Sequence, residues 1–300
     1  MNALAKAAAQ GDAQREQAYL LLLENAEYQQ SIIDAISKPA EGKPWKLYRP
    51  IFLTTARVDA GLAFWRENAE LLAAVESKYK VPAEYIVAII GVETFYGRNT
   101  GKHRVLDSLT TLGLYYPPRQ KFFAEQLIQF LQFSEIARIK VDPLEVRGSY
   151  AGAMGLGQFI PSSYVNFASD GNGDGVIDLW TERSDVIASV ANYLAVHGWE
   201  DGGPVVAKAK VAPHARNVQD PGVEPVYPVR QLQEWGYSPK GNFKPMRLAS
   251  LLQLDGEKGW ETYATFKNFY VITRYNRSPL YAMAVHQFAQ RLKREFKTRP

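Results

Sequence analysis

The chain has 300 residues, of which 46% are hydrophobic and 22% are charged, as is ordinary for a soluble globular protein. It contains no cysteine, which excludes disulfides and thiolate metal sites. Lysine and arginine exceed aspartate and glutamate by 35 − 31 = 4. These charges are interspersed and form no basic block, so no nucleic-acid partner is expected.

Several segments carry the spacing of apolar residues that is typical of helices. The predicted helices span 14–38, 54–79, 119–139, 184–196 and 279–297, and Ser184 is the expected N-cap of the fourth. Residues 39–50 are punctuated by proline and glycine and are expected to form a connector. Pro82 suits the first turn of a further helix that runs into Glu93.

From residue 201 to about 265 the composition changes to glycine, proline and short β-branched runs such as 205–211, which is typical of a small strand-rich module. No run approaches the roughly 20 apolar residues of a membrane span. The N-terminal residues lack the apolar core of a signal peptide. The sequence therefore predicts a mainly α (α+β) protein with a β-rich insertion and no transmembrane segment.

Glu93 stands at the end of an apolar run, in which six of the eight preceding residues are Ile, Val or Ala. Burying an ionised carboxylate is costly unless it is paired or its pKa rises. One interpretation is a glutamate at a helix end that reaches solvent or pairs with Arg98. The other is an acid that must stay protonated in order to work.

A second motif, GSYAGAMGLGQFIPSSY, spans residues 148–164 and has four glycines within ten residues. Such a density of glycine lets the backbone approach a ligand or another element closely. Gln158 adds a donor and an acceptor to an apolar patch. A tight packing turn before a helix that starts at Pro161 is the alternative interpretation.

Together the two motifs resemble the MltB-type lytic transglycosylases, a branch of the goose-lysozyme-like superfamily. The resemblance runs from about Tyr48 to Phe288 and is most specific in residues 91–112, 148–163 and 270–285. It implies a lysozyme-like helical core at 79–200 and a helical domain made of 1–78 and 279–300. The strand-rich composition predicts a β-rich domain at 201–265, followed by a return segment at 266–278 that lines the cleft.

The resemblance also implies the substrate and the residues that bind it. The substrate is a peptidoglycan strand of alternating N-acetylglucosamine and N-acetylmuramic acid, and Glu93 is the sole catalytic acid/base. Family members can carry two adjacent arginines where this chain has Pro118 and Arg119, so the acidic lactyl-peptide part of the substrate is left to Arg119. The other implied substrate-binding residues are Ser149 and Gln158 beside the glutamate, and Tyr48, Tyr193, Tyr275, Asn276 and Tyr281 along the groove.

Most glycosidases use two carboxylates, but neither Asp107 nor Glu125 has a context that nominates it as the second. The family mechanism needs only one. Glu93 protonates the glycosidic oxygen, the substrate's N-acetyl group stabilises the oxocarbenium-like centre, and Glu93 then deprotonates the C6 hydroxyl, which closes a 1,6-anhydro ring. This requires a glutamate with a raised pKa. A muramidase that hydrolyses the same bond and a non-catalytic peptidoglycan-binding module remain the alternatives.

Residues 170–178, DGNGDGVID, resemble the start of an EF-hand calcium loop. Thr181 occupies the position of the usual closing acid and does not fit it, so the family resemblance suggests a longer loop closed by Asp185, with Glu182 as the second choice. A turn rich in Asp and Gly with helix caps is the alternative. The predicted ligands of this structural calcium ion are Asp170, Asn172, Asp174, Val176 through its carbonyl, Asp178 and Asp185.

The sequence contains no motif typical of a zinc hydrolase, a serine hydrolase or a nucleotide-binding enzyme. The four histidines show no HxxxH or HExxH pairing, and there is no G-x-S-x-G elbow and no P-loop. No cofactor is expected for catalysis. The expected protein is a monomer in the periplasm, either soluble or a lipoprotein trimmed of its N-terminal cysteine, and partners in the wall-synthesis machinery are left open.

Overall fold

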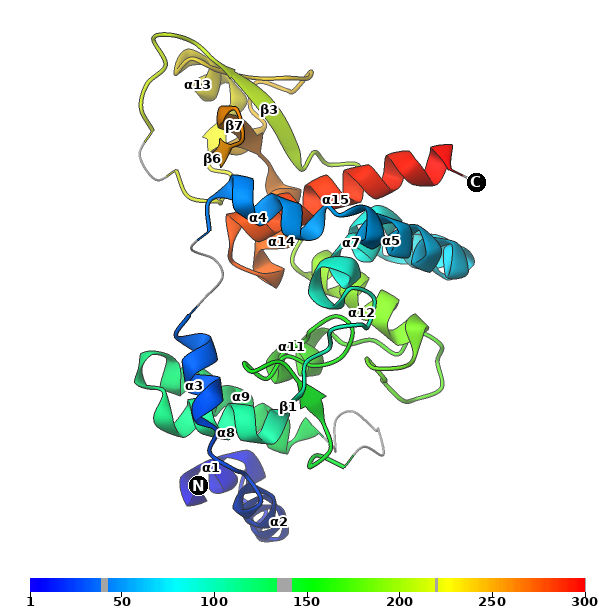
Figure 1. The fold of residues 1–300 in the computed structure, drawn as a ribbon, viewed down its shortest axis with the longest axis vertical. Coiled ribbons are helices and arrows are strands. Elements are labelled where there is room, and N and C mark those ends of the chain that lie inside the picture. Colours follow the sequence, from blue (N-terminus) through cyan, green and yellow to red (C-terminus); the bar gives the residue numbers. More distant parts are fainter. Residues whose placement is uncertain (39–42, 134–141, 219–220, 300) are drawn as a thin grey trace. The chain divides into compact units, whose positions relative to one another are not determined.

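The computed structural model describes residues 1–38, 43–133, 142–218 and 221–299 (Figure 1). These residues form mainly helices together with a small antiparallel sheet, which confirms the predicted mainly α (α+β) class. The chain divides into two compact units: unit 1 contains residues 1–40 and 93–192, and unit 2 contains residues 41–92 and 193–300. The finer four-part division implied by the family resemblance stays a prediction.

Unit 1 is built around α8 (Val105–Tyr115) and α9 (Gln120–Leu131), which pack against each other and are joined by a short 3-10 turn (Pro117–Arg119). Residues 105–113 of α8 are all buried, so this helix forms the centre of the unit. Its other described elements are α1 (Asn2–Ala9), α2 (Ala13–Glu24), α3 (Gln30–Ile36), α11 (Pro161–Phe167), most of α12 (Arg183–Val196), β1 (His103–Arg104) and β2 (Arg147–Gly148).

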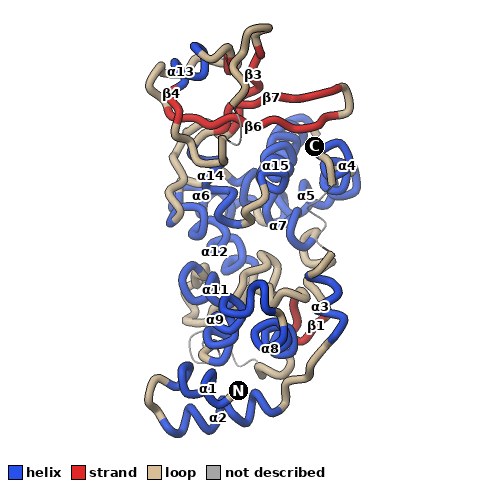
Figure 2. Tube along the Cα trace, turned by 90° about the vertical axis from the view of Figure 1, so that its left-hand side faces the viewer, coloured by secondary structure: helices blue, strands red, loops and turns tan. Residues whose placement is uncertain are grey.

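Unit 2 combines helices with a five-stranded antiparallel sheet of order β4-β6-β7-β3-β5, whose strands are drawn in red in Figure 2. The strands are β3 (Val206–Val211), β4 (Tyr227–Pro228), β5 (Tyr237–Pro239), β6 (Leu248–Gly256) and β7 (Gly259–Thr265). The helices are α4 (Trp45–Phe52), α5 (Thr55–Glu67), α6 (Ala69–Tyr79), most of α7 (Ala83–Thr94), α13 (Val229–Glu234), α14 (Lys267–Tyr275) and α15 (Pro279–Thr298). The sheet has its own small core, centred on Leu232 and Phe266, both fully buried.

The predicted strand-rich module and the C-terminal helix are confirmed, whereas two long predicted helices are each broken in two. The helix predicted at 14–38 is interrupted because the backbone N–H of Glu27 donates to Asp107 and that of Gln29 donates to Thr111. These tertiary hydrogen bonds replace intrahelical ones. The helix predicted at 54–79 breaks at Asn68, which has non-helical backbone angles of φ −120° and ψ 24°.

Three further boundaries differ from the sequence prediction. The connector predicted at 39–50 becomes helical from Trp45, and residues 39–42 lie outside the described part. The helix predicted at 119–139 ends at Leu131, and residues 134–141 also lie outside the described part of the chain. Ser184 is not the N-cap of α12, because its hydroxyl and N–H both donate to Glu182, which precedes the helix.

Candidate active site

Glu93 lies in the last turn of α7, as the sequence predicted. Residues 86–90 of this helix are completely buried, and Glu93 itself is half-buried. The helix ends immediately afterwards in an unusual turn, where Phe95, Tyr96 and Gly97 have φ of 53°, 58° and 92°. Left-handed backbone costs a bulky residue roughly 1–2 kcal/mol, and such strain is found chiefly where surrounding contacts enforce it at functional positions.

Thr94 holds this turn in place. Its side chain is fully buried. The Thr94 hydroxyl donates to the Leu156 carbonyl at 2.9 Å and accepts from the Gly97 N–H at 3.1 Å. The guanidinium of Arg98 lies 4.6 Å from the centre of the Phe95 ring. Thr94 therefore links the end of α7 both to the following turn and to the glycine-rich motif.

The glycine-rich motif forms a compact fold-back against this turn. Gln158, with φ 51°, donates from its side-chain amide to the Thr100 carbonyl at 3.1 Å and to the Gly155 carbonyl at 3.0 Å. A Cβ on Gly155 would lie 2.5 Å from the Leu179 carbonyl oxygen, so only glycine fits there. Through Thr94 and Gln158, the two sequence motifs meet within unit 1.

Ser149 sits in the same fold-back. Its hydroxyl oxygen accepts from the N–H groups of Ala151 and Ala153 at 3.2 and 3.0 Å. A serine hydroxyl can accept and donate at once, so this arrangement orients the oxygen and leaves its proton to donate to a ligand. Ser149 and Gln158 stay predictions as substrate-binding residues. Nothing in the sequence pointed to Thr94, whose partner lies 62 residues further along the chain.

Three of the predicted groove residues of unit 2, Tyr193, Tyr275 and Asn276, lie at the C-terminal end of α14. Tyr193 donates its hydroxyl to the Arg274 carbonyl at 2.6 Å, and its ring centre lies 4.7 Å from that of Tyr275. Burial raises the pKa of Tyr193 to about 12, so its hydroxyl keeps its proton at neutral pH. The Asn276 side chain accepts from the N–H of Ser278 at 3.0 Å, at the turn that leads into α15.

Two other predicted groove residues of unit 2 are buried. Tyr281 is 3% exposed, and its N–H is capped by the Ser278 hydroxyl at the start of α15. Tyr48 is 6% exposed and packs its ring against Trp45 and Phe52 within α4. In this structure both side chains contribute more to packing than to an open surface.

Arg119 is exposed in the 3-10 turn of unit 1, where its guanidinium lies 4.4 Å from the centre of the Phe122 ring. It borders a surface cavity of about 460 Å³ that Glu125 also lines. Asp107, by contrast, accepts two hydrogen bonds from Arg104 and one from the N–H of Glu27. These contacts give Asp107 a structural task in unit 1.

The first half of the predicted calcium loop is a tight turn in which side-chain oxygens accept backbone N–H bonds. Asp170 accepts from the N–H of Gly173 at 2.6 Å and of Gly175 at 2.8 Å, and these bonds lower the pKa of its carboxyl. Asn172 and Asp174 each accept from the N–H two residues further on. Gly175, at the position where an EF-hand loop requires glycine, has φ 86°. The Asp, Asn and carbonyl oxygens here are of the type that Ca²⁺ prefers.

The second half of the loop fits a metal less well. Both oxygens of the buried Asp185 accept backbone N–H bonds, from Gly171 and Asp178 at 2.7 Å each, and burial raises the pKa of this carboxyl. Asp178 caps the turn at residues 180–181. Within the described ranges, no three Asp, Glu, His or Cys side chains are placed to share one metal ion. Asp178 and Asp185, like Asp170, Asn172 and Asp174, accept backbone N–H bonds, and the predicted ligands do not converge on one ion in this structure.

Comparison with known proteins gives a family match over nearly the whole chain. The family model for the Transglycosylase SLT domain matches residues 1–290. Membrane-bound lytic murein transglycosylase B of Escherichia coli is 44% identical over 256 residues, which cover 84% of this chain and 69% of that protein. In the described part of this chain, no helix combines the length and apolar character needed to cross a membrane.

Solved structures agree with this match. Soluble lytic transglycosylase SltB1 from Pseudomonas aeruginosa is 44% identical, with a TM-score of 0.89 over 98% of each chain. Escherichia coli Slt35, solved with calcium, is 38% identical, with a TM-score of 0.88 over 98% of this chain and 92% of that one. SltB3 from Pseudomonas aeruginosa, solved with NAG-anhNAM-pentapeptide, is 31% identical, with a TM-score of 0.81 over 97% of this chain and 78% of that one. The chain belongs to this family and is an MltB-type peptidoglycan lytic transglycosylase with the lysozyme-like fold.

Proposed function

We propose that Glu93 is the single acid/base with which this enzyme cleaves the β-1,4 bond between N-acetylmuramic acid and N-acetylglucosamine, leaving 1,6-anhydro ends. The observation that carries the proposal is the position of Glu93, after a completely buried stretch of α7 and before a strained turn that Thr94 ties to the glycine-rich motif. Such a setting suits a carboxyl group that must begin the cycle protonated.

The proposed cycle starts with proton transfer from Glu93 to the glycosidic oxygen, and the bond to the muramoyl C1 then breaks. The substrate's own N-acetyl oxygen stabilises the developing positive charge at C1. The Glu93 carboxylate next takes the proton of the muramoyl C6 hydroxyl, whose oxygen bonds to C1 and closes the anhydro ring. Glu93 is thereby protonated again, and no water is consumed. The anhydromuramoyl ligand of the related SltB3 is the kind of product that this cycle forms.

The remaining predicted residues are proposed to hold the glycan. Ser149 and Gln158 act beside Glu93, since the hydroxyl of Ser149 still has a proton to donate. Arg119 has the charge to bind the acidic lactyl-peptide part of the substrate. The groove residues proposed in unit 2 are Tyr48, Tyr193, Tyr275, Asn276 and Tyr281.

Mass spectrometry of the products released from purified peptidoglycan tests the proposal, with wild type beside Glu93→Gln. The glutamine keeps the size of the side chain and loses the transferable proton. Anhydromuramoyl products that disappear in the variant are the expected result. Reducing ends would instead identify a muramidase, and binding to the wall without any release by wild type would identify a binding module.

We also propose that the loop at 170–185 binds a structural calcium ion, as the calcium-bound structure of the related Slt35 suggests. Asp170, Asn172, Asp174, Asp178 and Asp185 would hold it with the carbonyl of Val176, and their oxygens would have to turn toward a common point, because they do not converge in this structure. A bound ion would cross-link the loop. Isothermal titration with CaCl₂ should show one site that Asp174→Ala removes, and no heat of binding would refute the proposal.

The location of the substrate supports a periplasmic enzyme, either soluble or derived from a lipoprotein, with peptidoglycan strands as its partner. Cell fractionation with an antibody against the chain tests this location. Recovery in the cytoplasmic fraction would contradict it.

A further inference from the structure

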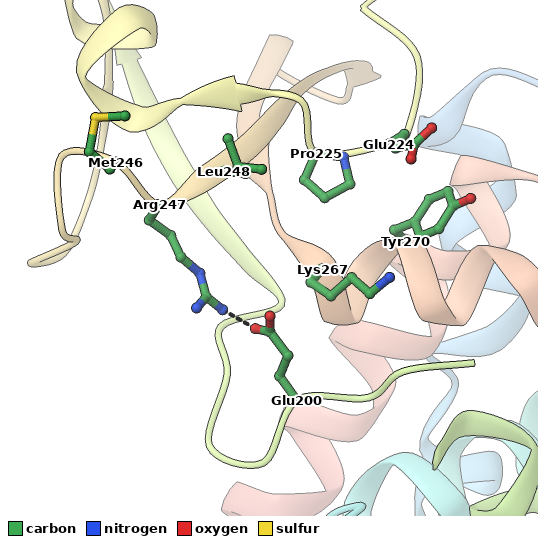
Figure 3. A pocket seen from close by; sticks show the side chains of 8 residues that line it. All are labelled: Glu200, Glu224, Pro225, Met246, Arg247, Leu248, Lys267 and Tyr270. Atoms are coloured by element: carbon green, nitrogen blue, oxygen red, sulfur yellow. Dashed lines mark hydrogen bonds and ion pairs between the residues drawn. The ribbon is translucent and has the colours of Figure 1, made fainter. Parts of the chain in front are cut away.

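Unit 2 contains a pocket of about 360 Å³ that none of the residues proposed for catalysis or glycan binding lines. Four segments far apart in the sequence build it: the loop after α12, the segment before β4, the start of β6, and α14 (Figure 3). The residues that line it are Glu200, Glu224, Pro225, Met246, Arg247, Leu248, Lys267 and Tyr270. We propose that this pocket binds the zwitterionic end of a stem-peptide side chain, one that carries both an ammonium and a carboxylate.

The walls of the pocket are held by buried hydrogen bonds. Asn268, which is fully buried, accepts from the N–H of Glu200 at 2.7 Å and donates to the carbonyls of Glu200 and Gly203 at 2.9 and 3.0 Å. On the opposite side, the carbonyl of Arg247 accepts from the N–H of Val229 at 2.9 Å. These bonds fix two walls of the pocket before any ligand arrives, which lowers the entropic cost of binding.

The charges in the pocket are balanced but not all paired. Glu200 and Arg247 form an ion pair, shown by the dashed line in Figure 3. Across residues 1–38, 43–133, 142–218 and 221–299, the Lys267 ammonium has no carboxylate partner and Glu224 has no cation partner. One available cation and one available anion in the same pocket suit a ligand with both charges better than a simple anion or cation.

The ammonium of Lys267 is also held in position. It lies 5.1 Å from the centre of the Tyr270 ring, one turn along α14, a distance typical of a cation–π contact. Its side chain also runs close to Gly198, where an added Cβ would lie 3.4 Å from the Lys267 Cε atom. Lys267 therefore presents its charge from a restricted position.

The rim of the pocket is apolar. Met246 and Leu248 are 63% and 47% exposed, and Pro225 lies between Leu248 and Tyr270 in Figure 3. Such a surface suits the methylene chain that connects a side-chain zwitterion to its backbone. Charged groups inside the pocket and an apolar rim thus match the two parts of one side chain.

The position of the pocket on α14 indicates how the ligand reaches it. Lys267 begins this helix, and Tyr275 and Asn276, proposed above to contact the glycan, end it. Eight residues of helix at about 1.5 Å each separate Lys267 from Tyr275 by roughly 12 Å. An extended peptide covers that span with about four residues. A stem peptide attached to a muramoyl residue near Tyr275 is therefore long enough to reach the pocket. This inference rests on the proposed function, because it assumes that the glycan binds near Tyr275.

Isothermal titration with a soluble stem tetrapeptide containing meso-diaminopimelate tests the proposal, because it requires no turnover. Two analogues sharpen it: one with the side-chain carboxylate amidated and one with the side-chain ammonium acetylated. We expect Lys267→Met and Glu224→Gln each to weaken binding of the parent peptide about 5- to 10-fold, as for loss of one partly exposed charged contact. Lys267→Met should cause no further loss with the amidated analogue, and Glu224→Gln none with the acetylated one.

Lys258→Met is the matched control, since Lys258 is an exposed lysine in the turn between β6 and β7 and does not line the pocket. It should bind the parent peptide as wild type does. No binding by wild type, or equal losses with all three peptides, would overturn the proposal. Failure of the Glu93→Gln experiment would overturn the proposed mechanism without changing these isotherms, so the two failures are distinguishable.

Discussion

The hydroxyl of Thr94 is predicted to be the main support of the turn that follows Glu93, and Thr94→Val tests this with almost no change in side-chain volume. The substitution removes the hydrogen bonds to the Leu156 carbonyl at 2.9 Å and from the Gly97 N–H at 3.1 Å. Thr94 is 0% exposed, so water cannot easily replace it. Leaving each group without a partner costs about 1–2 kcal/mol, which gives a loss of roughly 2–4 kcal/mol in the free energy of unfolding.

Urea denaturation at pH 7 measures this loss, and muropeptide release measures the accompanying fall in activity. Thr110→Val is the matched control, because Thr110 is also buried in unit 1 but its hydroxyl has no hydrogen-bond partner in the described part of the chain. Removing an unsatisfied hydroxyl should change stability by less than about 1 kcal/mol or increase it. Equal losses from the two substitutions would refute the role given to Thr94.

Two other predictions concern stability. Burial lowers the pKa of His286 to about 4. The free energy of unfolding that the neutral imidazole contributes is therefore complete above the unfolded-state pKa of about 6.5 and is lost as pH falls toward 4. The loss reaches about 3 kcal/mol at most; His286→Gln should flatten this part of the stability profile, and parallel profiles would contradict the prediction. A Cβ at Gly101, which has φ 95°, would lie 2.0 Å from the Gly148 carbonyl oxygen, so Gly101→Ala should lower the thermal midpoint by several degrees. Gly11→Ala, with a similar φ and nothing within 4 Å, is the control that isolates the collision.

Local sequence patterns predicted the elements whose boundaries are set locally. The helix at 279–298 has a serine N-cap and a proline in its first turn, and the strand-rich segment shows short β-branched runs. The breaks in the two long helices were missed for different reasons. The break near residue 27 depends on Asp107, 80 positions away, whereas Asn68 gave only a weak local signal in its helix.

The candidate site shows the same limit. The motifs around Glu93 and Gln158 were visible in the sequence, but the contacts that join them, Thr94 to Leu156 and Gln158 to Thr100, span 62 and 58 residues. In the calcium loop, the spacing of oxygen-bearing residues predicted a ligand set. It did not show that both oxygens of Asp185 accept backbone N–H bonds, from Gly171 and Asp178.

The placement of Glu93 at the end of α7 has a further consequence for catalysis. The negative end of the helix dipole and the buried apolar residues before it both oppose ionisation of a carboxyl group. Since the proposed first step requires Glu93 to be protonated, we expect kcat to fall as pH rises through the Glu93 pKa, with a midpoint above the ~4.3 of an ordinary glutamate. A rate that falls already around pH 4 would show that the helix end leaves Glu93 an ordinary acid. The strain at Phe95 and Tyr96 would then have to be explained by packing alone.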